Sequence, residues 1–383
     1  MKKICMISTV SVTMKAFILE TAKYLHTQCG YDVTLICNKD DIFAQSLPPY
    51  LHYIPVPMAR GIDFSAFKSI RAFKKIFKQE KFDFVQYATP NASFYASIAA
   101  KAAKIPIRAY FQWGIRYVGF SGFKRKIFKF LEKIVCKNST HVFAVSPLNR
   151  QFAISEKLYD EEKSQVIGNG GTIGVNLEEY DVHKKAEWRT IVRKEYNVSD
   201  NDFVFGFAGR ISKDKGCGEL LEAFQFVHEQ CPQAKLLVVG PLEENCGIEQ
   251  TRIDWAKQSD SVIFTGSVSG EKMREYYAAM DVLVHPTYRE GFGMVIQEAG
   301  ALAVATITTK IPGASEVMEN GVSCALVAPK NVEELRDKML EICADTAKAL
   351  AYGEAAYTRT VDLYERRGML ENQRKTYTAL LGE

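Results

Sequence analysis

"DFVFGFAGRISKDKG", residues 202–216, reads as a buried strand followed by a short loop rich in cations. The apolar run ends at Gly209, and Arg210 and Lys215 follow before a helical pattern begins near Gly218. An apolar strand that passes through a glycine turn into a helix is the repeating unit of a parallel sheet covered by helices. The stretch therefore predicts the first strand of a Rossmann-like domain.

The same alternation organises the chain on both sides of this stretch. Before it come "KKICMIST", "YDVTLICN", "FDFVQYAT", "IRAYFQ" and "HVFAVS", and after it come "AKLLVVGP", "SVIFTGS", "DVLVHPT", "ATITT" and "SCALVAP", each separated by helical segments. A charged stretch near 176–200 interrupts the rhythm. We predict an α/β protein with two Rossmann-like domains, 1–172 and 173–355. The helical residues 356–383 are expected to cross back and pack on the first domain.

Composition narrows the class of protein. At 383 residues with 47% hydrophobic content, the chain is long enough for two globular domains. Its nine cysteines include no C-x-x-C pair, which favours reduced thiols in the cytoplasm over a disulfide framework or a zinc site. Apolar runs stay well short of the roughly 20 residues of a membrane-spanning helix, so we expect any membrane contact to be peripheral.

Charge is distributed unevenly along the chain. Residues 1–170 hold 25 Lys and Arg against 12 Asp and Glu, whereas the remainder holds 24 against 33. A basic first half is expected to face something anionic, such as lipid headgroups, nucleic acid or a phosphorylated substrate. Solubility is the alternative explanation. No groove-reading or base-stacking motif accompanies the positive charge, so a nucleic-acid partner is not expected.

The two cations of the opening stretch form a candidate anion site. Ligands of open parallel sheets bind at the carboxyl ends of the strands, and two such domains facing each other are expected to enclose a cleft. Arg210 and Lys215 follow a strand and precede a helix amino terminus, which suits a diphosphate. Two solvated loop cations are the alternative.

A second loop, "YREGFGMVIQEAG" at 288–300, carries two carboxylates. Glu290 lies in the loop, and Glu298 lies one to two turns inside a helix expected from about Phe292. A carboxylate at that depth needs partners, because burying it unpaired costs several kcal/mol. Ribose hydroxyls would serve, and so would a protein cation.

These motifs together resemble the retaining glycosyltransferases of family 4, which have the GT-B fold. The resemblance rests on "HPTYREGFG", "IPGASEVMENGVSCALVAP", "VIGNGGTIGVNLEEYD" and the two loop cations, in order along nearly the whole chain. The segment "WGIRYVGFSGFKRKIFKFLEKIVCKNSTHVFAVS" is similar to bacterial enzymes that extend capsular, O-antigen or other lipid-linked glycans on a polyprenyl-diphosphate carrier.

The resemblance implies a role for each matching residue. Arg210 and Lys215 would bind the diphosphate of the donor, Glu298 would accept the ribose hydroxyls, and Glu290 would hold the sugar beside the reacting carbon. The catalytic set would then be Glu290, Arg210 and Lys215. Further substrate contacts are implied at Gly291, Phe292, Gly293, Asn169, Trp113, Gly114 and Arg116.

One of these positions departs from the family pattern. Many members have His-Gly where this chain has Trp113-Gly114, and that histidine usually lies against the donor sugar. Either Gln112 or Trp113 is left to take its place. For Arg116, contact with an acceptor and pairing at the surface are both open.

A divalent metal is not expected at this site. The Asp-x-Asp pair of Asp200 and Asp202 precedes the strand of the opening stretch, at the end opposite the predicted cleft, and reads as a turn. Arg210 and Lys215 would replace the ion, so no metal and no cofactor are predicted.

The basic first half contains an amphipathic segment at 123–137. It combines an apolar stripe with many lysines, and "FKSIRAFKKIFKQEK" at 67–81 is similarly basic. We expect this face to dock on the anionic inner leaflet, with packing of the stripe on the sheet as the alternative. The stripe comprises Phe123, Ile127, Phe130, Leu131 and Ile134.

These expectations combine into one hypothesis. The chain would be a peripheral, cytoplasmic, metal-independent transferase that moves a hexose or N-acetylhexosamine from a UDP-sugar to a polyprenyl-diphosphate-linked saccharide held by the first domain. A transferase with a soluble acceptor and a GT-B sugar-nucleotide epimerase are alternative enzymes. A non-catalytic GT-B partner subunit is the alternative from another class.

Overall fold

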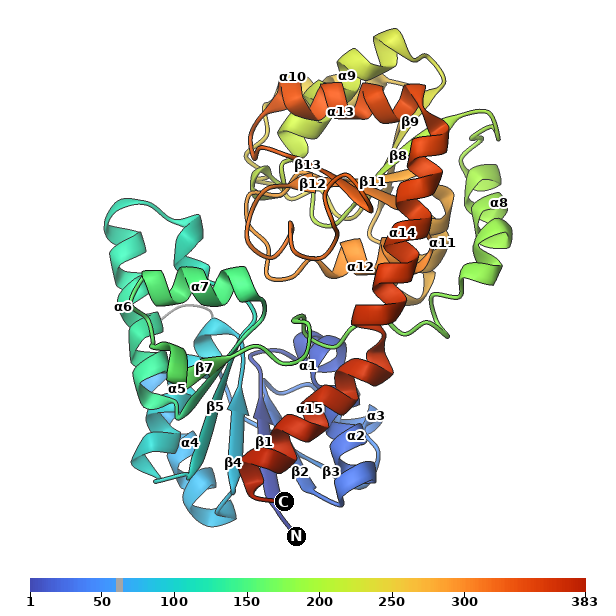
Figure 1. Cartoon of the computed structure of the whole chain (residues 1–383). Coiled ribbons are helices and arrows are strands. Elements are labelled where there is room, and N and C mark those ends of the chain that lie inside the picture. The colour runs from blue at the N-terminus through green and yellow to red at the C-terminus, as the bar shows by residue number, and fades with distance from the viewer. Residues whose placement is uncertain (60–64) are drawn as a thin grey trace. The chain divides into compact units, whose positions relative to one another are not determined.

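Apolar strands form two separate parallel sheets, one in each of two units of the chain. The computed structural model describes residues 1–59 and 65–383. Unit 1 comprises Met1–Ile173 and Arg367–Glu383, and unit 2 comprises Gly174–Arg366 (Figure 1). Each unit alternates strands with helices, as the sequence predicts for Rossmann-like domains.

The described part of unit 1 contains a seven-stranded sheet in the order β3-β2-β1-β4-β5-β6-β7, with every neighbouring pair parallel. The strands are β1 Lys3–Ile7, β2 Asp32–Cys37, β3 Leu51–Pro55, β4 Phe84–Tyr87, β5 Ile107–Gln112, β6 His141–Ala144 and β7 Ser164–Gln165. The helices are α1 Ser11–Phe17, α2 Leu19–Cys29, α3 Asp41–Ser46, α4 Ser65–Glu80, α5 Pro90–Ala102, α6 Gly122–Asn138, α7 Pro147–Ser155 and α15 Arg366–Leu381, with short 3₁₀ turns η1 Arg116–Gly119 and η2 Glu161–Lys163.

Both faces of this sheet are covered because successive side chains of a strand point to opposite sides. Ile4 and Met6 of β1 belong to one core cluster, with residues of α2 and α15. Cys5 and Ile7 belong to another, with residues of α4, α5 and α6. The uninterrupted apolar run of this strand is therefore explained by burial on both faces.

Unit 2 contains a six-stranded parallel sheet in the order β10-β9-β8-β11-β12-β13. Its strands are β8 Phe203–Ala208, β9 Ala234–Val239, β10 Val262–Gly266, β11 Val282–His285, β12 Ala305–Thr309 and β13 Cys324–Val327. Its helices are α8 Lys185–Glu195, α9 Cys217–Gln230, α10 Gln250–Gln258, α11 Met273–Ala279, α12 Met294–Ala301, α13 Val332–Ala344 and α14 Thr346–Tyr364, with 3₁₀ turns η3 Val182–Lys184, η4 Lys213–Lys215 and η5 Gly270–Lys272.

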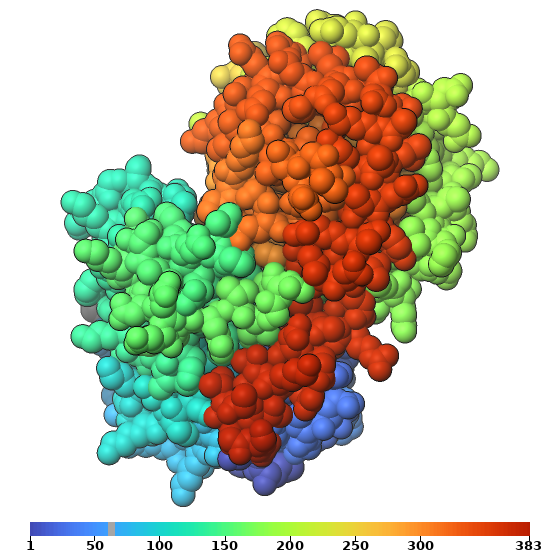
Figure 2. All heavy atoms as spheres, viewed as in Figure 1, coloured from blue at the N-terminus to red at the C-terminus, as the bar shows by residue number. Residues whose placement is uncertain are grey.

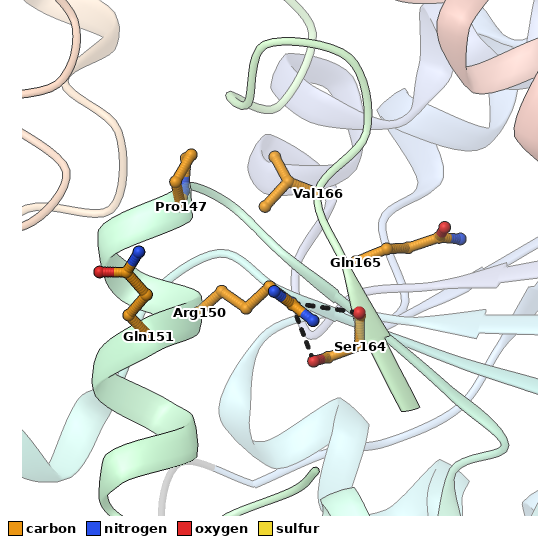
Figure 3. A pocket seen from close by; sticks show the side chains of 6 residues that line it. All are labelled: Pro147, Arg150, Gln151, Ser164, Gln165 and Val166. Carbon is orange, nitrogen blue, oxygen red and sulfur yellow. Dashed lines mark hydrogen bonds between the residues drawn. The ribbon is translucent and has the colours of Figure 1, made fainter. Parts of the chain in front are cut away.

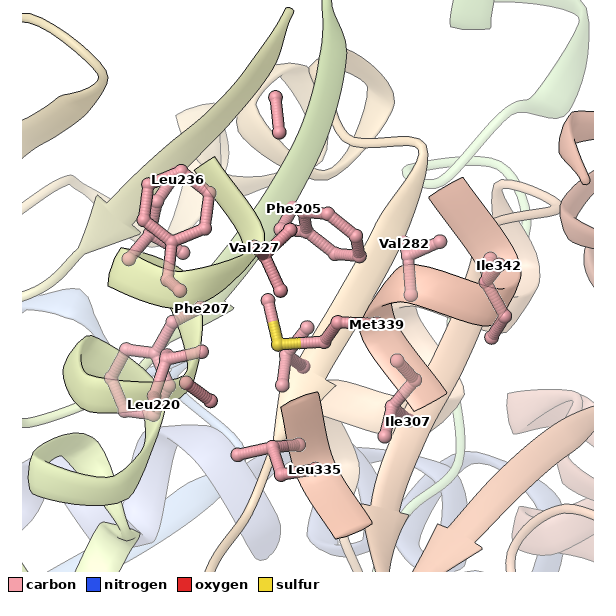
Figure 4. Packing of buried hydrophobic residues seen from close by; sticks show 14 of the residues in the cluster. Phe205, Phe207, Leu220, Val227, Leu236, Val282, Ile307, Leu335, Met339 and Ile342 are labelled. Carbon is pink, nitrogen blue, oxygen red and sulfur yellow. The ribbon is translucent and has the colours of Figure 1, made fainter. Parts of the chain in front are cut away.

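Helices α9 and α13 cover one face of the second sheet. Phe205 and Phe207 of β8 point into the core between the sheet and these helices (Figure 4). The rest of the labelled core comes from α9, α13 and the neighbouring strands, as Leu220, Val227, Leu236, Val282, Ile307, Leu335, Met339 and Ile342. Close packing on this face fixes β8, and with it the loop that carries the two cations.

The chain returns to unit 1 later than expected. The predicted start of the returning segment, residue 356, falls inside α14, and Arg367–Glu383 is the segment that belongs to unit 1. Helix α14 stays with unit 2 because one glycine of its own, Gly353, and one of α12, Gly300, allow it to pack closely on the start of β12 and on α12. A Cβ on Gly353 would lie 2.4 Å from the carbonyl oxygen of Ala303, and one on Gly300 would lie 2.5 Å from Thr360 Oγ1.

Helix α15 packs into unit 1 through one buried aromatic side chain. Tyr377 is fully buried, its ring stacks on Phe84 with centroids 4.4 Å apart, and its hydroxyl donates to Gln86. Thr21 Oγ1 also donates to Gln373 of this helix at 2.6 Å. Figure 2 shows α15, in red, on the surface of unit 1 between the blue and green segments of that unit.

Truncating Tyr377 should therefore weaken unit 1. We expect Tyr377→Ala to lower the free energy of unfolding by about 3 to 5 kcal/mol, the usual loss for a buried aromatic side chain. Urea unfolding of the full chain measures the loss, and Lys375→Ala, on the exposed side of the same helix, is the control. A loss below about 1 kcal/mol would show that α15 does not depend on this contact.

Candidate functional site

Two loops of unit 2 meet where the strand order reverses. Strands β8 and β11 are neighbours, but β8 continues to β9 on one side and β11 to β12 on the other. At such a switch point the loops after the two strands diverge, and ligands of open α/β sheets bind there. The loops are 209–216 and 286–293, which carry most of the predicted site residues.

Backbone contacts hold these two loops together. The carbonyl oxygen of Asp214 accepts hydrogen bonds from the Tyr288 amide at 2.9 Å and from Thr287 Oγ1 at 3.3 Å. Gly216 has a φ of 72°, and a Cβ there would lie 2.0 Å from the carbonyl oxygen of Pro286. Only glycine fits this position, since both the φ and the close approach exclude a side chain.

Glu290 lies at the centre of this contact. Its Oε2 accepts hydrogen bonds from Lys215 Nζ at 2.8 Å and from His285 Nε2 at 3.0 Å. Its Oε1 accepts from the amide of Gly291 at 3.0 Å. The structure thus brings the predicted residues Lys215 and Glu290 into direct contact and adds a histidine.

The surroundings keep this carboxylate ionised and the histidine neutral. Burial alone would raise the pKa of Glu290, but the hydrogen bond from His285 and the charge of Lys215 outweigh it and lower the pKa of Glu290 well below its ordinary value. Burial lowers the pKa of His285, against the opposing effect of Glu290. A neutral imidazole has one N–H, and since a carboxylate oxygen can only accept, that proton lies on Nε2.

Arg210 lies at the edge of the site and is half exposed. Its guanidinium contacts Glu243 Oε1 at 2.5 Å and Asp214 Oδ2 at 3.7 Å. Exposed ion pairs contribute little, about 0 to 1 kcal/mol, so an anionic ligand can replace these partners at small cost. Arg210 can therefore exchange its present partners for an anionic group, whereas the pair of Lys215 with Glu290 is largely buried, with side chains 21% and 19% exposed.

The backbone from Gly291 to Gly293 comes close to a third loop. A Cβ on Gly313, which follows β12, would lie 2.2 Å from the carbonyl oxygen of Gly291. Gly293 has a φ of 49° and precedes α12, which begins at Met294 and not at the expected Phe292. Phe292 is 4% exposed and its ring packs against Tyr364, so this side chain is not open to a ligand.

Glu298 lies inside α12 and is paired with tyrosines. Tyr277 donates its hydroxyl to Glu298 Oε2 at 2.8 Å, and Tyr180 is a second donor. Burial raises the pKa of Glu298 to about 7, although both tyrosines and the charge of Arg366 act in the opposite direction. This group therefore titrates near neutrality.

The remaining predicted residues lie in unit 1. Trp113 follows β5 and packs against Phe17, with ring centroids 5.4 Å apart. Gly114 comes next and is partly buried, and Arg116 stacks on Phe128 of α6 at 4.5 Å. Asn169 is exposed in the loop after β7.

Gln112 is committed to an internal network and does not offer a replacement for the family's histidine. It is buried, donates to Glu132 Oε1 at 2.6 Å and accepts from the hydroxyl of Tyr159 at 2.8 Å. Tyr110 donates to the same Glu132 oxygen. Of the two candidates, Trp113 is the one with an accessible side chain.

Asp200 and Asp202 lie at the amino end of β8, away from the loops of the site. Asp202 Oδ2 accepts a hydrogen bond from the amide of Ser199 at 2.8 Å, which closes the turn before the strand. Within residues 1–59 and 65–383, no three His, Cys, Asp or Glu side chains gather closely enough to hold a metal ion.

A surface pocket in unit 1 is lined by residues other than the predicted site residues. It lies between α7 and β7, and Arg150 points across it (Figure 3). The guanidinium is occupied, since Nε donates to the carbonyl oxygen and hydroxyl of Ser164 and Nη2 donates to the carbonyl oxygen of Glu161. Arg150 therefore connects α7 to the segment that contains Glu161 and Ser164, and we assign no ligand to this pocket.

Sequence reasoning missed His285 and the two tyrosines beside Glu298. Spacing gives no signal for Tyr180 and Tyr277, which come from distant parts of the chain. A signal for His285 was present, because it is the last residue of an apolar strand and precedes Glu290 by one short loop. Polar residues at that end of a parallel strand are candidates for a site.

Comparison with known families covers both units. Residues 189–359 match the family described as Glycosyl transferases group 1, and residues 14–171 match the family described as Glycosyltransferase Family 4. The predicted resemblance is thereby confirmed.

Two curated relatives match along most of their length. The chain is 31% identical over 329 residues to the capsular polysaccharide biosynthesis glycosyltransferase CapM of Staphylococcus aureus, covering 86% of this chain and 85% of CapM. It is 24% identical over 327 residues to the UDP-Gal:alpha-D-GlcNAc-diphosphoundecaprenol alpha-1,3-galactosyltransferase of Escherichia coli, covering 82% of this chain and 81% of that enzyme.

A solved structure supports the fold. HepE of Anabaena, crystallised in complex with UDP and glucose, superimposes with a TM-score of 0.78 at 20% identity, covering 99% of this chain and 100% of HepE. This agreement confirms the predicted fold of two parallel-sheet Rossmann-like domains.

The raised pKa of Glu298 predicts a stability effect that depends on pH. Between its ordinary value near 4.5 and about 7, the folded protein holds a proton that the unfolded chain has released, so stability falls as the pH rises through this window. Glutamine does not titrate. We therefore expect Glu298→Gln to be more stable than the original protein at pH 8, by about 1 to 3 kcal/mol, and nearly equal to it at pH 5.

Urea unfolding at pH 5 and pH 8 measures this difference. Glu333→Gln, at an exposed position of α13, is the control and should leave the comparison between the two pH values unchanged. An equal effect of Glu298→Gln at both pH values would contradict the assignment of a raised pKa to this carboxyl.

Proposed function

This chain belongs to glycosyltransferase family 4 and has the GT-B fold, and from that premise we propose that it transfers a sugar from UDP to a lipid-linked saccharide. The sugar is a hexose or an N-acetylhexosamine, the acceptor is a saccharide on polyprenyl diphosphate, and the anomeric configuration is retained. The observation that carries the proposal is the contact of Lys215 with Glu290 at the switch point of unit 2, where a cation and an ionised carboxylate meet.

The two cations of the site suit the leaving group. When the bond between the sugar and the diphosphate breaks, negative charge grows on the phosphate oxygens. Arg210 and Lys215 follow β8 within one loop. The ion pairs of Arg210 are exposed and the side chain of Lys215 is partly exposed, so a diphosphate can replace their present partners. Preorganised cations at such a position contribute a few kcal/mol each to transition-state stabilisation. They would supply the charge that a divalent metal supplies elsewhere.

Glu290 suits the sugar. Positive charge develops on the sugar ring as the bond breaks, and an ionised carboxylate beside it is stabilising. The same carboxylate can accept hydrogen bonds from sugar hydroxyls. In the retaining reaction we propose, the acceptor hydroxyl attacks the anomeric carbon on the face that the diphosphate leaves, and its proton passes to the leaving phosphate oxygen. No separate protein base is needed.

Glu298 suits the ribose. Its carboxylate is within the first turns of α12 and is oriented by Tyr277. Two ribose hydroxyls are good donors to a carboxylate, and the interaction favours the ionised form, which prevails above pH 7.

Relatives support the choice of donor and acceptor. The E. coli enzyme uses UDP-Gal and a diphosphoundecaprenol-linked acceptor according to its name, and HepE was crystallised with UDP. We assign the acceptor to unit 1, with Arg116 as a candidate contact to it. Trp113 would take the place of the family's histidine against the donor sugar, and Gly114 and Asn169 would be further substrate contacts. The group transferred and the acceptor saccharide remain part of this proposal.

Nucleotide binding tests the donor site before any acceptor is known. In EDTA, we expect UDP to bind more tightly than GDP or ADP, and we expect Lys215→Ala and Glu298→Ala to weaken UDP binding tenfold or more, roughly 1.4 kcal/mol. Calorimetry measures the dissociation constants. Lys213→Ala is the matched control, since Lys213 is an exposed cation of the same loop and, in the described part of the chain, forms no ion pair with Glu290 or Glu298.

Two of the alternative functions predict other results. Absence of nucleotide binding would overturn the donor site and favour a non-catalytic GT-B subunit. Binding that requires a divalent ion would contradict the role given to Arg210 and Lys215. If UDP-N-acetylglucosamine bound and were converted to another UDP-sugar without an acceptor, the protein would be an epimerase.

Helix α6 supports a membrane-facing role for unit 1. Three residues of the predicted stripe, Phe123, Ile127 and Phe130, share one face at helical spacing and are 77%, 42% and 63% exposed, so this part of the stripe does not pack on the sheet. The other two, Leu131 and Ile134, are partly buried. Glu132 and Val135 occupy the buried face of the same helix. Of the lysines on this helix, Lys124, Lys126, Lys133 and Lys137 are exposed.

We propose that this face of α6 docks on an anionic lipid surface. Apolar side chains flanked by lysines match the boundary between headgroups and acyl chains, and each cation near such a surface contributes about 1 kcal/mol. None of the described helices is long and apolar enough to span a membrane. A peripheral contact would bring unit 1 to a lipid-linked acceptor.

Vesicle sedimentation tests this surface. We expect the protein to bind vesicles of phosphatidylglycerol and phosphatidylcholine in equal parts, and to bind phosphatidylcholine alone weakly. Changing Phe123, Ile127 and Phe130 together to serine should reduce binding about tenfold, because apolar burial is lost. Phe226→Ser, at an exposed position of α9 in unit 2, is the control. Unchanged binding of the triple variant would contradict the proposal.

A further inference from the structure

A buried histidine stands behind the carboxylate of the proposed donor site. His285 is the last residue of β11, its side chain is 1% exposed, and its Nε2 lies 3.0 Å from Glu290 Oε2. Its carbonyl oxygen accepts from Thr308 Oγ1 at 2.9 Å, which ties the residue to β12. The imidazole therefore has a fixed position and cannot itself reach a ligand.

Glu290 has two partners for the same oxygen, and they differ in burial. The side chain of Lys215 is 21% exposed and that of His285 is 1% exposed, so of the two it is Lys215 that can contact a ligand. In the proposed function Lys215 binds the diphosphate of the donor. When it does so, Glu290 loses its cation at the moment when the carboxylate has to face the sugar.

We propose that His285 is a positioning residue that keeps Glu290 ionised and oriented toward the donor sugar while Lys215 binds the diphosphate. This inference rests on the proposed function. His285 acts through Glu290 and does not touch the substrate.

The hydrogen bonds available to the two ring nitrogens of His285 favour a neutral imidazole that donates to Glu290. Nδ1 of His285 is buried and has no hydrogen-bond partner among the residues that the structure describes. A protonated imidazole would leave an N–H buried and unsatisfied there, which is unfavourable. The neutral ring instead places its single N–H on Nε2, toward Glu290. Phe207 stacks beside the ring at 6.5 Å, and the charged groups that face it are Glu290 and Lys215.

The same geometry leaves Glu290 with capacity for a ligand. A carboxylate oxygen has two lone pairs. Oε2 accepts from His285 and Lys215, whereas Oε1 accepts from the amide of Gly291. With His285 and Gly291 holding one oxygen each, the carboxylate stays aligned when Lys215 leaves, and each oxygen can still accept a sugar hydroxyl.

The test compares the binding of UDP with that of UDP-sugars. The contribution of the sugar is the ratio of the dissociation constant of UDP to that of the tightest binder among UDP-glucose, UDP-galactose, UDP-N-acetylglucosamine and UDP-N-acetylgalactosamine. We expect His285→Phe, which retains ring packing and removes the donor, to lower this ratio at least fivefold, as Glu290→Gln should. The dissociation constant of UDP itself should change less than twofold.

A conservative variant and a pH series separate positioning from packing. His285→Gln keeps an amide donor and should recover part of the sugar contribution. In His285→Phe, the contribution of the sugar should also fall between pH 7 and pH 5 while that of the original protein stays constant, because Glu290 has lost one of the donors that favour its ionised form.

His228→Phe is the matched control. This histidine also lies in unit 2, stacks on a phenylalanine, Phe224, and hydrogen-bonds a backbone carbonyl, but it is on α9 away from Glu290. Thermal unfolding of every variant shows whether it is folded. If His285→Phe is folded and keeps the sugar contribution at every pH, the inference is wrong. If the original protein binds no nucleotide, the proposed function is wrong, and the inference that rests on it is wrong as well.

Discussion

The ion pair between Lys215 and Glu290 joins the two loops on which the candidate site depends. One residue follows β8 and the other follows β11, strands that are adjacent in the sheet but diverge in their connections. Around this pair, the carbonyl oxygen of Asp214 accepts from Tyr288, and Gly216 lies against Pro286. The site is thus built mainly from backbone contacts, and its charged side chains are left to exchange partners.

In the function we propose, this arrangement lets a site made of ion pairs accept a charged ligand. The pairs of Arg210 with Glu243 and Asp214 are exposed, so water already competes with them and their replacement by phosphate costs little. His285 is different because it is buried and its position is set by β11 and β12. In the inference we propose, Lys215 can turn to the ligand while the buried His285 keeps the carboxylate of Glu290 oriented.

Several parts of the site could be predicted from local sequence. Strands rich in Phe, Val and Ile can be recognised in the sequence, and so can the point at which each strand ends. Arg210, Lys215 and Glu290 lie in the loops that follow two of these strands. Chain direction then places them at one edge of the sheet. The partners of Glu298 could not be found this way, since Tyr180 and Tyr277 are far apart in sequence and meet only through packing. The same holds for Gln112, whose network with Glu132 and Tyr159 depends on α6.

The sequence by itself determined the fold class, the family and the identity of the charged residues, because hydrophobic periodicity and motif spacing are local properties of the chain. Tertiary structure decided which of these groups pair and which stay exposed. Phe123 looks equally apolar whether it packs on a sheet or faces solvent, and His285 looks like any lone histidine until Glu290 is folded against it. Burial and pairing depend on neighbours from distant segments, which only the packed chain brings together.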